Sequence, residues 1–388
     1  MSSVLRSVEP LARRAWPALF LSTILVITWA LVDSFADVVY TDTAAKMFLM
    51  LIVVLGLQMF SGNSGVLSFG HVAFMAVGAY TSALLTIPTA IKQFTYLSMP
   101  HFLKFWIFPA QLNAIQGTLA GAGFAAVLAL ITAPAIARLA GVQAGIATLA
   151  VLVIVYVFDV QTSAITRGTS TQIGVPTTTT LFSVFVWALI FISVAFAFKQ
   201  SRFGLRLRAS RENERAARSV GVHVATERAL AWVLSGFVVG VSGALYGHYF
   251  GGTFGPDDFY FNSGFNIVLL TLAMLVVGGM TSVTGAVAGC YFVTIVYEGF
   301  RRWEVNGLNG VQPPAGTSNF VLAIVLLLTL VLRPNGITGG REIPWPGDWS
   351  LTALKQAPAR ALRRGVSIDS PPPVEVADVP EQATGSTE

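Results

Sequence analysis

Ten apolar blocks, separated by polar or charged residues, constrain the fold of this chain more than any other feature. Each block approaches the roughly 20 residues that an α-helix needs to cross about 30 Å of hydrocarbon, and most contain no charged residue. The blocks are residues 16–32, 44–60, 65–87, 114–137, 141–158, 180–198, 229–250, 264–280, 283–300 and 316–332. With 54% hydrophobic and only 11% charged residues, the composition is not that of an ordinary soluble domain. The sequence therefore predicts an all-α, polytopic membrane protein of about ten transmembrane helices.

An eleventh apolar patch, residues 102–109, is too short to cross a bilayer. Pro100 and Pro109 flank it, and prolines at both ends favour a break in the chain direction. We therefore interpret this patch as a re-entrant or surface segment.

The distribution of basic residues predicts the orientation of the chain. Ten spans place both termini on the same side of the membrane, and if that side is the cytoplasm, 17 of the 24 lysines and arginines lie in cytoplasmic segments. Such a bias follows the positive-inside rule. We expect a cytoplasmic N-terminus at residues 1–15, a transmembrane domain at 16–340, a long cytoplasmic loop at 199–227 and a cytoplasmic tail at 341–388. The basic charge reports orientation, so we predict no nucleic-acid partner.

The composition changes at about residue 365. From there to the end the chain has five acidic residues, no basic ones and few bulky apolar ones. Such a segment cannot bury enough apolar surface to fold. We expect the tail to be disordered from about residue 365.

The sequence contains no recognisable cluster of catalytic or cofactor-binding residues. Cys290 is the one cysteine, and no cluster of Ser/His/Asp, Cys/His or metal-spaced His/Glu is visible. The Gly-x-x-x-x-Gly-Lys-Ser/Thr phosphate loop is also absent. We therefore predict no enzyme activity, no metal, no cofactor and no hydrolysis of ATP by this chain itself.

Small residues recur four positions apart in several blocks, which places them on one face of a helix. Glycines so spaced let helix backbones approach closely in a membrane. Close packing is the favoured interpretation, and lining of a transport pathway is the alternative. For the two histidines in the blocks, a hydrogen bond between helices and a contact to solute both stay open. The candidates for pathway or packing are Gly70, His71, Gly78, Gly243 and His248.

Charged residues are scarce inside the blocks. Only Asp159 and Glu298 are candidates, and both stand near block ends, where we expect water to be close. A carrier coupled to protons or sodium usually needs buried carboxylates near the middle of the membrane. This pattern favours transport powered from outside the chain, with a solo ion-coupled secondary transporter as the alternative.

The long basic loop has helical spacing. In one continuous helix, Arg211, Arg215 and Arg218 share a polar stripe, and Glu214 forms an i, i+4 pair with Arg218. Gly221 is then a natural helix stop. The spacing predicts a short amphipathic helix along the membrane, and the alternative is a solvated loop.

Residues 201–222, Ser-Arg-Phe-Gly-Leu-Arg-Leu-Arg-Ala-Ser-Arg-Glu-Asn-Glu-Arg-Ala-Ala-Arg-Ser-Val-Gly-Val, resemble the coupling loop of the branched-chain amino acid ABC transporter permeases of the LivM type. Four further stretches resemble that family in the same order, and the likeness covers most of the chain from about residue 45 to 340. These stretches are residues 64–80, 234–248, 276–286 and 332–336.

The resemblance implies a fold related to the vitamin B12 and ribose importer permeases, in a bacterial inner membrane. It implies three kinds of partner besides the lipid bilayer: a second permease subunit, two ATP-binding subunits and a soluble solute-binding protein. The transported solute would be a branched-chain amino acid, another amino acid or a related small polar molecule.

The resemblance also implies that the loop at 199–227 couples transport to the ATPase. The residues that would do so are Arg211, Glu212, Glu214, Ala216, Ala217, Arg218 and Gly221. The sequence departs from the general importer motif at Arg215, where a Glu is usual, and it lacks the downstream Ile-x-Leu-Pro. The docking role therefore depends on the family likeness more than on the general motif.

Overall fold

The computed structural model describes residues 2–251, 254–260, 267–307 and 313–346. The chain divides into two compact units, Met1–Ile343 and Pro344–Glu388, and the first contains every helix described below. The predicted disorder of the tail from about residue 365 lies outside the described residues. The regular elements among the described residues are all helices, with no strand, so the all-α prediction is confirmed for this part of the chain.

Seven helices of the described chain are long and apolar enough to cross a membrane. They are the segment Ala15–Phe35 of α1 (Ser2–Phe35), α2 (Val38–Leu57) with its π-helical continuation η1 (Gln58–Gly62), α6 (Ala114–Ile136), α7 (Gly141–Gln161), α9 (Leu181–Gln200), α12 (Val224–Tyr249) and α15 (Val283–Asn306). The pair α3 (His71–Thr86) and α4 (Thr89–Thr95) counts as an eighth span if its 113° bend is one broken span. Two shorter apolar helices, α14 (Ile267–Gly278) and α16 (Thr317–Leu332), coincide with the remaining predicted blocks.

The third apolar block is shorter as a helix than the sequence predicts. Residues 65–70 are not helical, and α3 begins only at His71. Gly65 has φ +75°, which interrupts a right-handed helix. At the other end Ile87 precedes Pro88, and the ring of a proline disfavours helical backbone in the residue before it. The bend between α3 and α4 follows from that proline.

The apolar patch at residues 102–109 forms α5 (His101–Ile107), a helix of seven residues. No residue of α5 is buried, and Phe102, Phe105 and Trp106 are all largely exposed. Such a helix is far too short to span a bilayer. The choice between a surface and a re-entrant position stays a prediction.

Helices α3, α6 and α12 pack against one another through glycines. A methyl group on Gly78 would lie 2.2 Å from the carbonyl oxygen of Gly240, and one on Gly243 would lie 1.8 Å from that of Met75. A methyl group on Gly121 would lie 2.5 Å from the Gly78 carbonyl oxygen. We call this group of contacts the glycine core. Gly121, Gly240 and Gly243 belong to the four-residue repeats of the sequence, and their contacts are those of closely packed helices.

A second group of helices, α14, α15 and α16, packs beside α2. Here too backbones touch, because a methyl group on Gly289 of α15 would lie 1.9 Å from the Met274 carbonyl oxygen of α14. Helix α2 is buried along most of its length and contacts both α12 and α15. It therefore joins the two groups.

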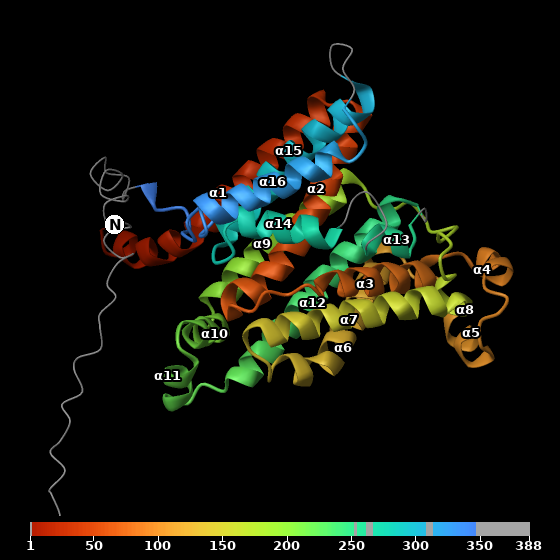
Figure 1. The fold of residues 1–388 in the computed structure, drawn as a ribbon, viewed down its shortest axis with the longest axis horizontal. Helices are drawn as coiled ribbons and strands as arrows, with labels where there is room; N and C mark the ends of the chain where they lie inside the picture. The colour runs from red at the N-terminus through yellow and green to blue at the C-terminus, as the bar shows by residue number, and fades with distance from the viewer. Residues whose placement is uncertain (1, 252–253, 261–266, 308–312, 347–388) are drawn as a thin grey trace, which may run out of the picture. The chain divides into compact units, whose positions relative to one another are not determined.

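Three short helices complete the first unit: α8 (Ser163–Thr166), α10 (Arg202–Glu212) and α11 (Glu214–Ser219), with a further turn, α13 (Pro256–Phe259), after α12. Figure 1 shows α10 and α11 at one end of the layer formed by α3, α6, α7 and α12, and α4, α5 and α8 at the opposite end. The basic loop and the exposed aromatic helix α5 thus lie at opposite ends of these helices.

Candidate functional site

The basic loop is built from two helices, so the predicted single helix is wrong. Asn213 separates α10 from α11 with extended backbone, at φ −152° and ψ 103°. Its side-chain oxygen accepts a hydrogen bond from the Ala216 N–H at 3.0 Å and so caps α11. Because the helix restarts there, Arg211 does not share a helical stripe with Arg215 and Arg218. We call α10 and α11 together the basic hairpin.

Glu214 holds the basic hairpin to α12. Its carboxylate pairs with Arg218 at 2.6 Å, which confirms the predicted i, i+4 pair, and with Arg228 of α12 at 2.9 Å. The Arg228 side chain is only 6% exposed. Burial alone would raise the pKa of the Glu214 carboxyl, but Arg228 and Arg218 hold it below its ordinary value. Sequence spacing had shown only the first of these two partners.

Gly221 ends α11, as predicted. Its backbone has φ +85°, a left-handed conformation that favours glycine. The Gly221 N–H donates to the Arg218 carbonyl oxygen at 3.0 Å, and the Val222 N–H donates to that of Ala217 at 3.1 Å. Ala217 is buried under this turn, whereas Ala216 is exposed. The two alanines of the predicted coupling set therefore face different surroundings.

Arg211 joins α10 to the end of η1. Its guanidinium donates to the Gly62 carbonyl oxygen at 2.8 Å and pairs with Glu212 at 2.5 Å. A methyl group on Gly65 would lie 2.5 Å from Cγ of Arg211, so this side chain covers the glycine. The Glu212 side chain is 72% exposed. Of these two predicted residues, one holds the hairpin in place and the other faces outward.

Glu342 connects the same region to the start of α15, and sequence analysis missed it. Its carboxylate accepts hydrogen bonds from the N–H groups of Val283 and Thr284 at 2.9 and 3.0 Å, and it pairs with Lys199. A carboxylate at a helix N-terminus also meets the positive end of the helix dipole. Arg208 of α10 donates to the Lys199 carbonyl oxygen at 3.0 Å. A link therefore runs from α10 through the end of α9 to α15.

The pKa of Glu342 reflects this setting. Burial alone would raise it, but the Lys199 ammonium and the hydrogen bonds from Thr284 hold it below its ordinary value. No local pattern points to this residue, because Glu342 is 143 positions away from Lys199 along the chain.

His71 is buried between helices. Its two ring nitrogens lie 2.7 Å from the Ser68 hydroxyl and 2.9 Å from the Ser235 hydroxyl, and it is 2% exposed. Phe60, Phe74 and Trp232 surround the ring. Two satisfied nitrogens in an aromatic cage favour helix packing over contact with solute.

His248 is buried in the same way. One ring nitrogen lies 2.8 Å from the Ser82 hydroxyl and the other 3.0 Å from the Pro176 carbonyl oxygen. Gly70 completes the set, because a methyl group there would lie 2.3 Å from the Thr148 carbonyl oxygen. Together with Gly78 and Gly243 of the glycine core, these predicted residues lie in packed helix contacts.

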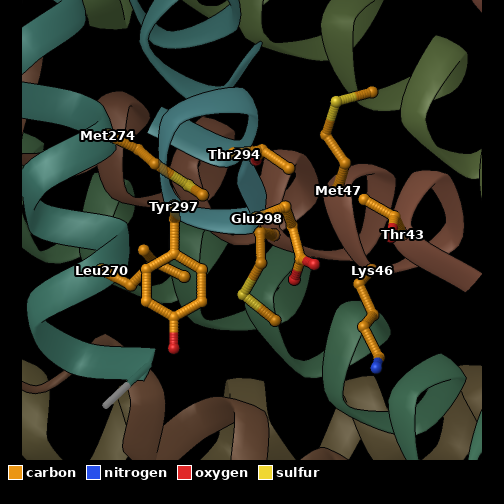
Figure 2. Close-up of a pocket in the computed structure, with 9 residues that line it drawn as sticks. Thr43, Lys46, Met47, Leu270, Met274, Thr294, Tyr297 and Glu298 are labelled. Atoms are coloured by element: carbon orange, nitrogen blue, oxygen red, sulfur yellow. The ribbon is translucent and has the colours of Figure 1, made fainter. Parts of the chain in front are cut away.

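A charged cavity of about 700 Å³ opens beside α2 and α15. A smaller niche of about 10 Å³ adjoins it, since Lys46, Met50, Tyr297 and Glu298 line both. Figure 2 shows this niche with Met47, Leu270, Met274 and Thr294 around it, and we call it the methionine niche. The charged side chains that line the cavity are Lys46, Asp258, Glu298, Arg301 and Glu304.

The charged cavity lies far from the basic hairpin. Gly62 touches Arg211, and Lys46 precedes it by 16 residues, or about 24 Å of helix. Glu298 likewise follows Val283, next to Glu342, by 15 residues, or about 22 Å. Either distance covers most of a hydrocarbon layer about 30 Å thick. The cavity and the hairpin are therefore at opposite ends of α2 and α15.

Asp159 is buried, so the expectation that water lies close to it is wrong. It is 3% exposed, and its carboxylate accepts a hydrogen bond from the Tyr260 hydroxyl at 2.8 Å. Proximity to the end of α7 did not bring it to water, because the segment after α12 covers it. Glu298, the other predicted acid, does line the charged cavity and pairs with Arg301 at 2.9 Å.

Comparison with known proteins is consistent with this architecture. The family described as "Branched-chain amino acid transport system / permease component" matches residues 39–330. The chain is 26% identical over 357 residues to the high-affinity branched-chain amino acid transport system permease protein LivM of Salmonella typhimurium, covering 82% of this chain and 74% of that protein.

A second relative is the probable branched-chain amino acid transport permease protein LivH of Methanocaldococcus jannaschii. It is 29% identical over 157 residues, or 40% of this chain, and the match spans about half of that relative, 47%. The family match and the long apolar helices together identify a multi-pass membrane protein. The chain belongs to the branched-chain amino acid transport permease family.

Proposed function

We propose that this chain is a permease subunit of an ABC importer. Together with a second permease subunit it forms the path for a branched-chain amino acid, another amino acid or a related small polar solute. Two ATP-binding subunits supply the energy, and a soluble solute-binding protein delivers the solute. The chain crosses a bacterial cytoplasmic membrane ten times, with both termini in the cytoplasm and a fold related to the vitamin B12 and ribose importer permeases.

The observation that carries this proposal is the attachment of the basic hairpin to three parts of the bundle. Arg211 bonds to the end of η1, Glu214 pairs with Arg228 of α12, and Arg208 reaches the Lys199–Glu342 pair at α15. A segment held this way moves only together with the helices it touches. It is suited to pass a force from a partner into the membrane domain.

Several side chains of the hairpin are exposed in the described chain and so available to such a partner. Phe203, Leu205 and Val220 are 49%, 52% and 78% exposed, and Arg215 and Ala216 are exposed as well. We assign the docking contact with the ATP-binding subunit to the exposed residues of the hairpin. Glu214, Ala217 and Arg211 position the hairpin, because their side chains are turned to the bundle or bonded to it.

Transport then follows by alternating access. Closure of the two ATP-binding subunits shifts the basic hairpin, and Arg211 passes the shift to η1. A methyl group on Gly62, at the end of η1, would lie 2.2 Å from the Met280 carbonyl oxygen, so η1 abuts the break between α14 and α15. This contact supports a route from the hairpin to the helices that line the charged cavity.

Reversal of one charge tests the proposal. Glu214→Arg places three arginines together and should release the hairpin from α12. The tagged chain is purified from its native host, co-purifying proteins are identified by mass spectrometry, and ATP-driven uptake is measured in proteoliposomes. We expect loss of the ATP-binding subunits, or at least a tenfold fall in uptake. The control Asp33→Arg reverses an exposed acid at the far end of α1 and should change neither.

Two results would contradict the proposal. One is an intact complex with unchanged uptake in Glu214→Arg. The other is uptake by the purified chain alone along a proton or sodium gradient, which would identify a solo secondary transporter.

A further inference from the structure

Several buried polar atoms without a partner occur together in η1 and the residue after it. Gln58, Ser61 and Asn63 are each 0% exposed. Both polar atoms of the Gln58 amide, the Ser61 hydroxyl and the side-chain oxygen of Asn63 make no hydrogen bond within the described chain. Burial of such atoms is costly, and the large majority of buried polar atoms in proteins have a partner. Burial of this segment therefore costs free energy that burial of the apolar residues 47–57 of α2 does not.

The same segment departs from α-helical geometry. Gln58–Gly62 form a π-helix, a rare conformation in which one turn holds an extra residue and which often occurs at functional sites. Asn63 supports the turn, because its amide nitrogen donates to the Met59 carbonyl oxygen at 2.9 Å. Gly65 follows with φ +75°, so the right-handed helix ends just after the turn.

Three other elements hold η1 in place. The Gly62 carbonyl oxygen accepts the Arg211 guanidinium of the basic hairpin at 2.8 Å. A methyl group on Gly62 would lie 2.2 Å from the Met280 carbonyl oxygen, so the backbone of η1 abuts the break between α14 and α15. Phe60 packs against Trp232 of α12, with ring centroids 4.9 Å apart. A displacement of Arg211 relative to the bundle would therefore pull on the turn that holds the unpartnered atoms.

Along α2, η1 lies between the charged cavity and the basic hairpin. Met50 lines the cavity, and Gln58 follows it by eight residues, or about 12 Å of helix. The intervening residues 51–57 are all buried and have no polar side chain. The first polar side chains that a solute leaving the cavity along α2 would meet are therefore those of Gln58 and Ser61.

We propose that η1 is the cytoplasmic gate of the solute path, closed in this structure, and that Gln58 and Ser61 line the path when the gate opens. One residue of an α-helix occupies about 100° of turn, so conversion of η1 to α-helix rotates its two ends against each other by about that angle. This rotation turns the Gln58 and Ser61 side chains out of the apolar core and into water. The inference rests on the proposed function, because it names the part of the membrane domain on which the basic hairpin acts.

Two buried serines provide a matched pair for the test. Ser61 and Ser242 are both 0% exposed, but the Ser242 hydroxyl donates to the Leu49 carbonyl oxygen at 2.8 Å. In the purified complex, Ser61→Cys and Ser242→Cys are treated with a small methanethiosulfonate reagent, first without nucleotide and then with ATP and vanadate. The native Cys290 is buried, and the parent chain gives its background rate.

We expect Ser61→Cys to react at least tenfold faster in one of these two states than in the other. The rate for Ser242→Cys should change less than twofold. Equal, slow rates for both variants in both states would overturn the inference. The polar atoms of η1 would then be permanently enclosed, as they would be around a structural water molecule.

Removal of the unpartnered atoms distinguishes a gate from an ordinary core segment. Gln58→Met keeps the length of the side chain without its polar atoms, and we combine it with Ser61→Ala. No side-chain hydrogen bond is lost, so the double variant should melt no lower than the wild type. ATP-driven uptake per folded complex should fall at least tenfold, because an apolar segment resists exposure to water.

Ser242→Ala should have the opposite effect. It loses the bond to the Leu49 carbonyl oxygen, so it should melt lower than the wild type while uptake per folded complex stays within twofold. A Gln58→Met, Ser61→Ala variant that behaves in this same way, with lower melting and normal uptake, would overturn the inference.

Uptake by the wild-type complex separates the inference from the proposed function. ATP-driven uptake by a complex in which Ser61→Cys stays unlabelled in both states would remove the gate and leave the importer. Labelling of Ser61→Cys that responds to a proton or sodium gradient and not to ATP would remove the importer and leave the gate.

Discussion

The glycine core and the charged cavity share neighbouring helices but are built in opposite ways. In the core, added methyl groups at Gly78, Gly121 and Gly243 would lie 1.8 to 2.5 Å from backbone oxygens of the next helix. In the cavity, long charged side chains line a space of about 700 Å³. Small residues thus occur where helix backbones touch, and charged side chains occur where a space is left between elements. This comparison predicts that the core keeps its shape and that the cavity can admit a solute.

Substitution of Gly243 should have the largest effect on stability. In Gly243→Ala the new methyl group would meet the Met75 backbone, which cannot swing aside as a side chain can. We expect at least about 3 kcal/mol of destabilisation from overpacking. The control is Gly123→Ala on α6, where no atom lies within 4 Å of the new methyl group and helix propensity favours alanine by about 1 kcal/mol. Thermal unfolding in detergent measures both, and similar melting temperatures would refute the glycine core.

His71→Ala should have the next largest effect. It removes two hydrogen bonds and leaves a cavity among Phe60, Phe74 and Trp232, and we expect a loss of about 2–4 kcal/mol. His223→Ala is the control, because His223 is exposed. Uptake per folded complex should stay within twofold of wild type. A tenfold fall in that ratio would return His71 to the transport path.

Glu298→Gln should lower uptake more than stability, which is the reverse of what we expect for the two preceding substitutions. Arg301, its partner, is 39% exposed, so loss of the pair should cost at most about 1 kcal/mol of stability. Uptake should fall about tenfold, because the charge balance of the cavity changes. Arg301→Gln provides the reciprocal change. If Glu298→Gln destabilised the protein as much as Gly243→Ala does, the cavity would belong to the rigid part.

Lowering the pH should have the smallest and most gradual effect on stability. It acts directly on neither the glycine core nor the charged cavity. The folded-state pKa of Glu342 lies below its ordinary value of 4.5. Its stabilising contribution is therefore complete above pH 4.5 and is lost as the pH falls through the folded pKa. Melting temperatures of the wild type and Glu342→Gln should differ most at neutral pH and converge in acid. A constant difference down to pH 3 would exclude ionisation of Glu342 as the cause.

Local pattern predicted part of the candidate site well. The Glu214–Arg218 pair and the stop at Gly221 involve residues within four positions or a single backbone angle, so spacing alone suffices. The break at Asn213 was missed, although a helix-capping residue stood in the sequence, because apolar and charged periodicity outweighed the capping signal. An Asn followed by an acidic first turn is the signal that would have found it.

The partners that give these residues their roles could not be predicted. Arg228 meets Glu214 across 14 residues, and Glu342 reaches Lys199 across 143. Asp159 was placed near water by its position at a helix end, yet Tyr260, 101 residues away, buries it. Each outcome depends on which helices become neighbours, and the periodicity of one helix carries no such information.

The sequence by itself determined the position of most apolar helices and of the glycines at which helices meet, although it did not determine every helix end. These properties depend on hydrophobicity and backbone freedom, which act over a few residues. Only the tertiary structure decided that Lys46, Asp258 and Glu298 line one cavity, and that the basic hairpin is bonded to η1, α12 and, through Lys199, to α15. Cavities and ion pairs of this kind exist only after distant helices pack, because their free energy depends on distances between atoms that the linear order of residues leaves open.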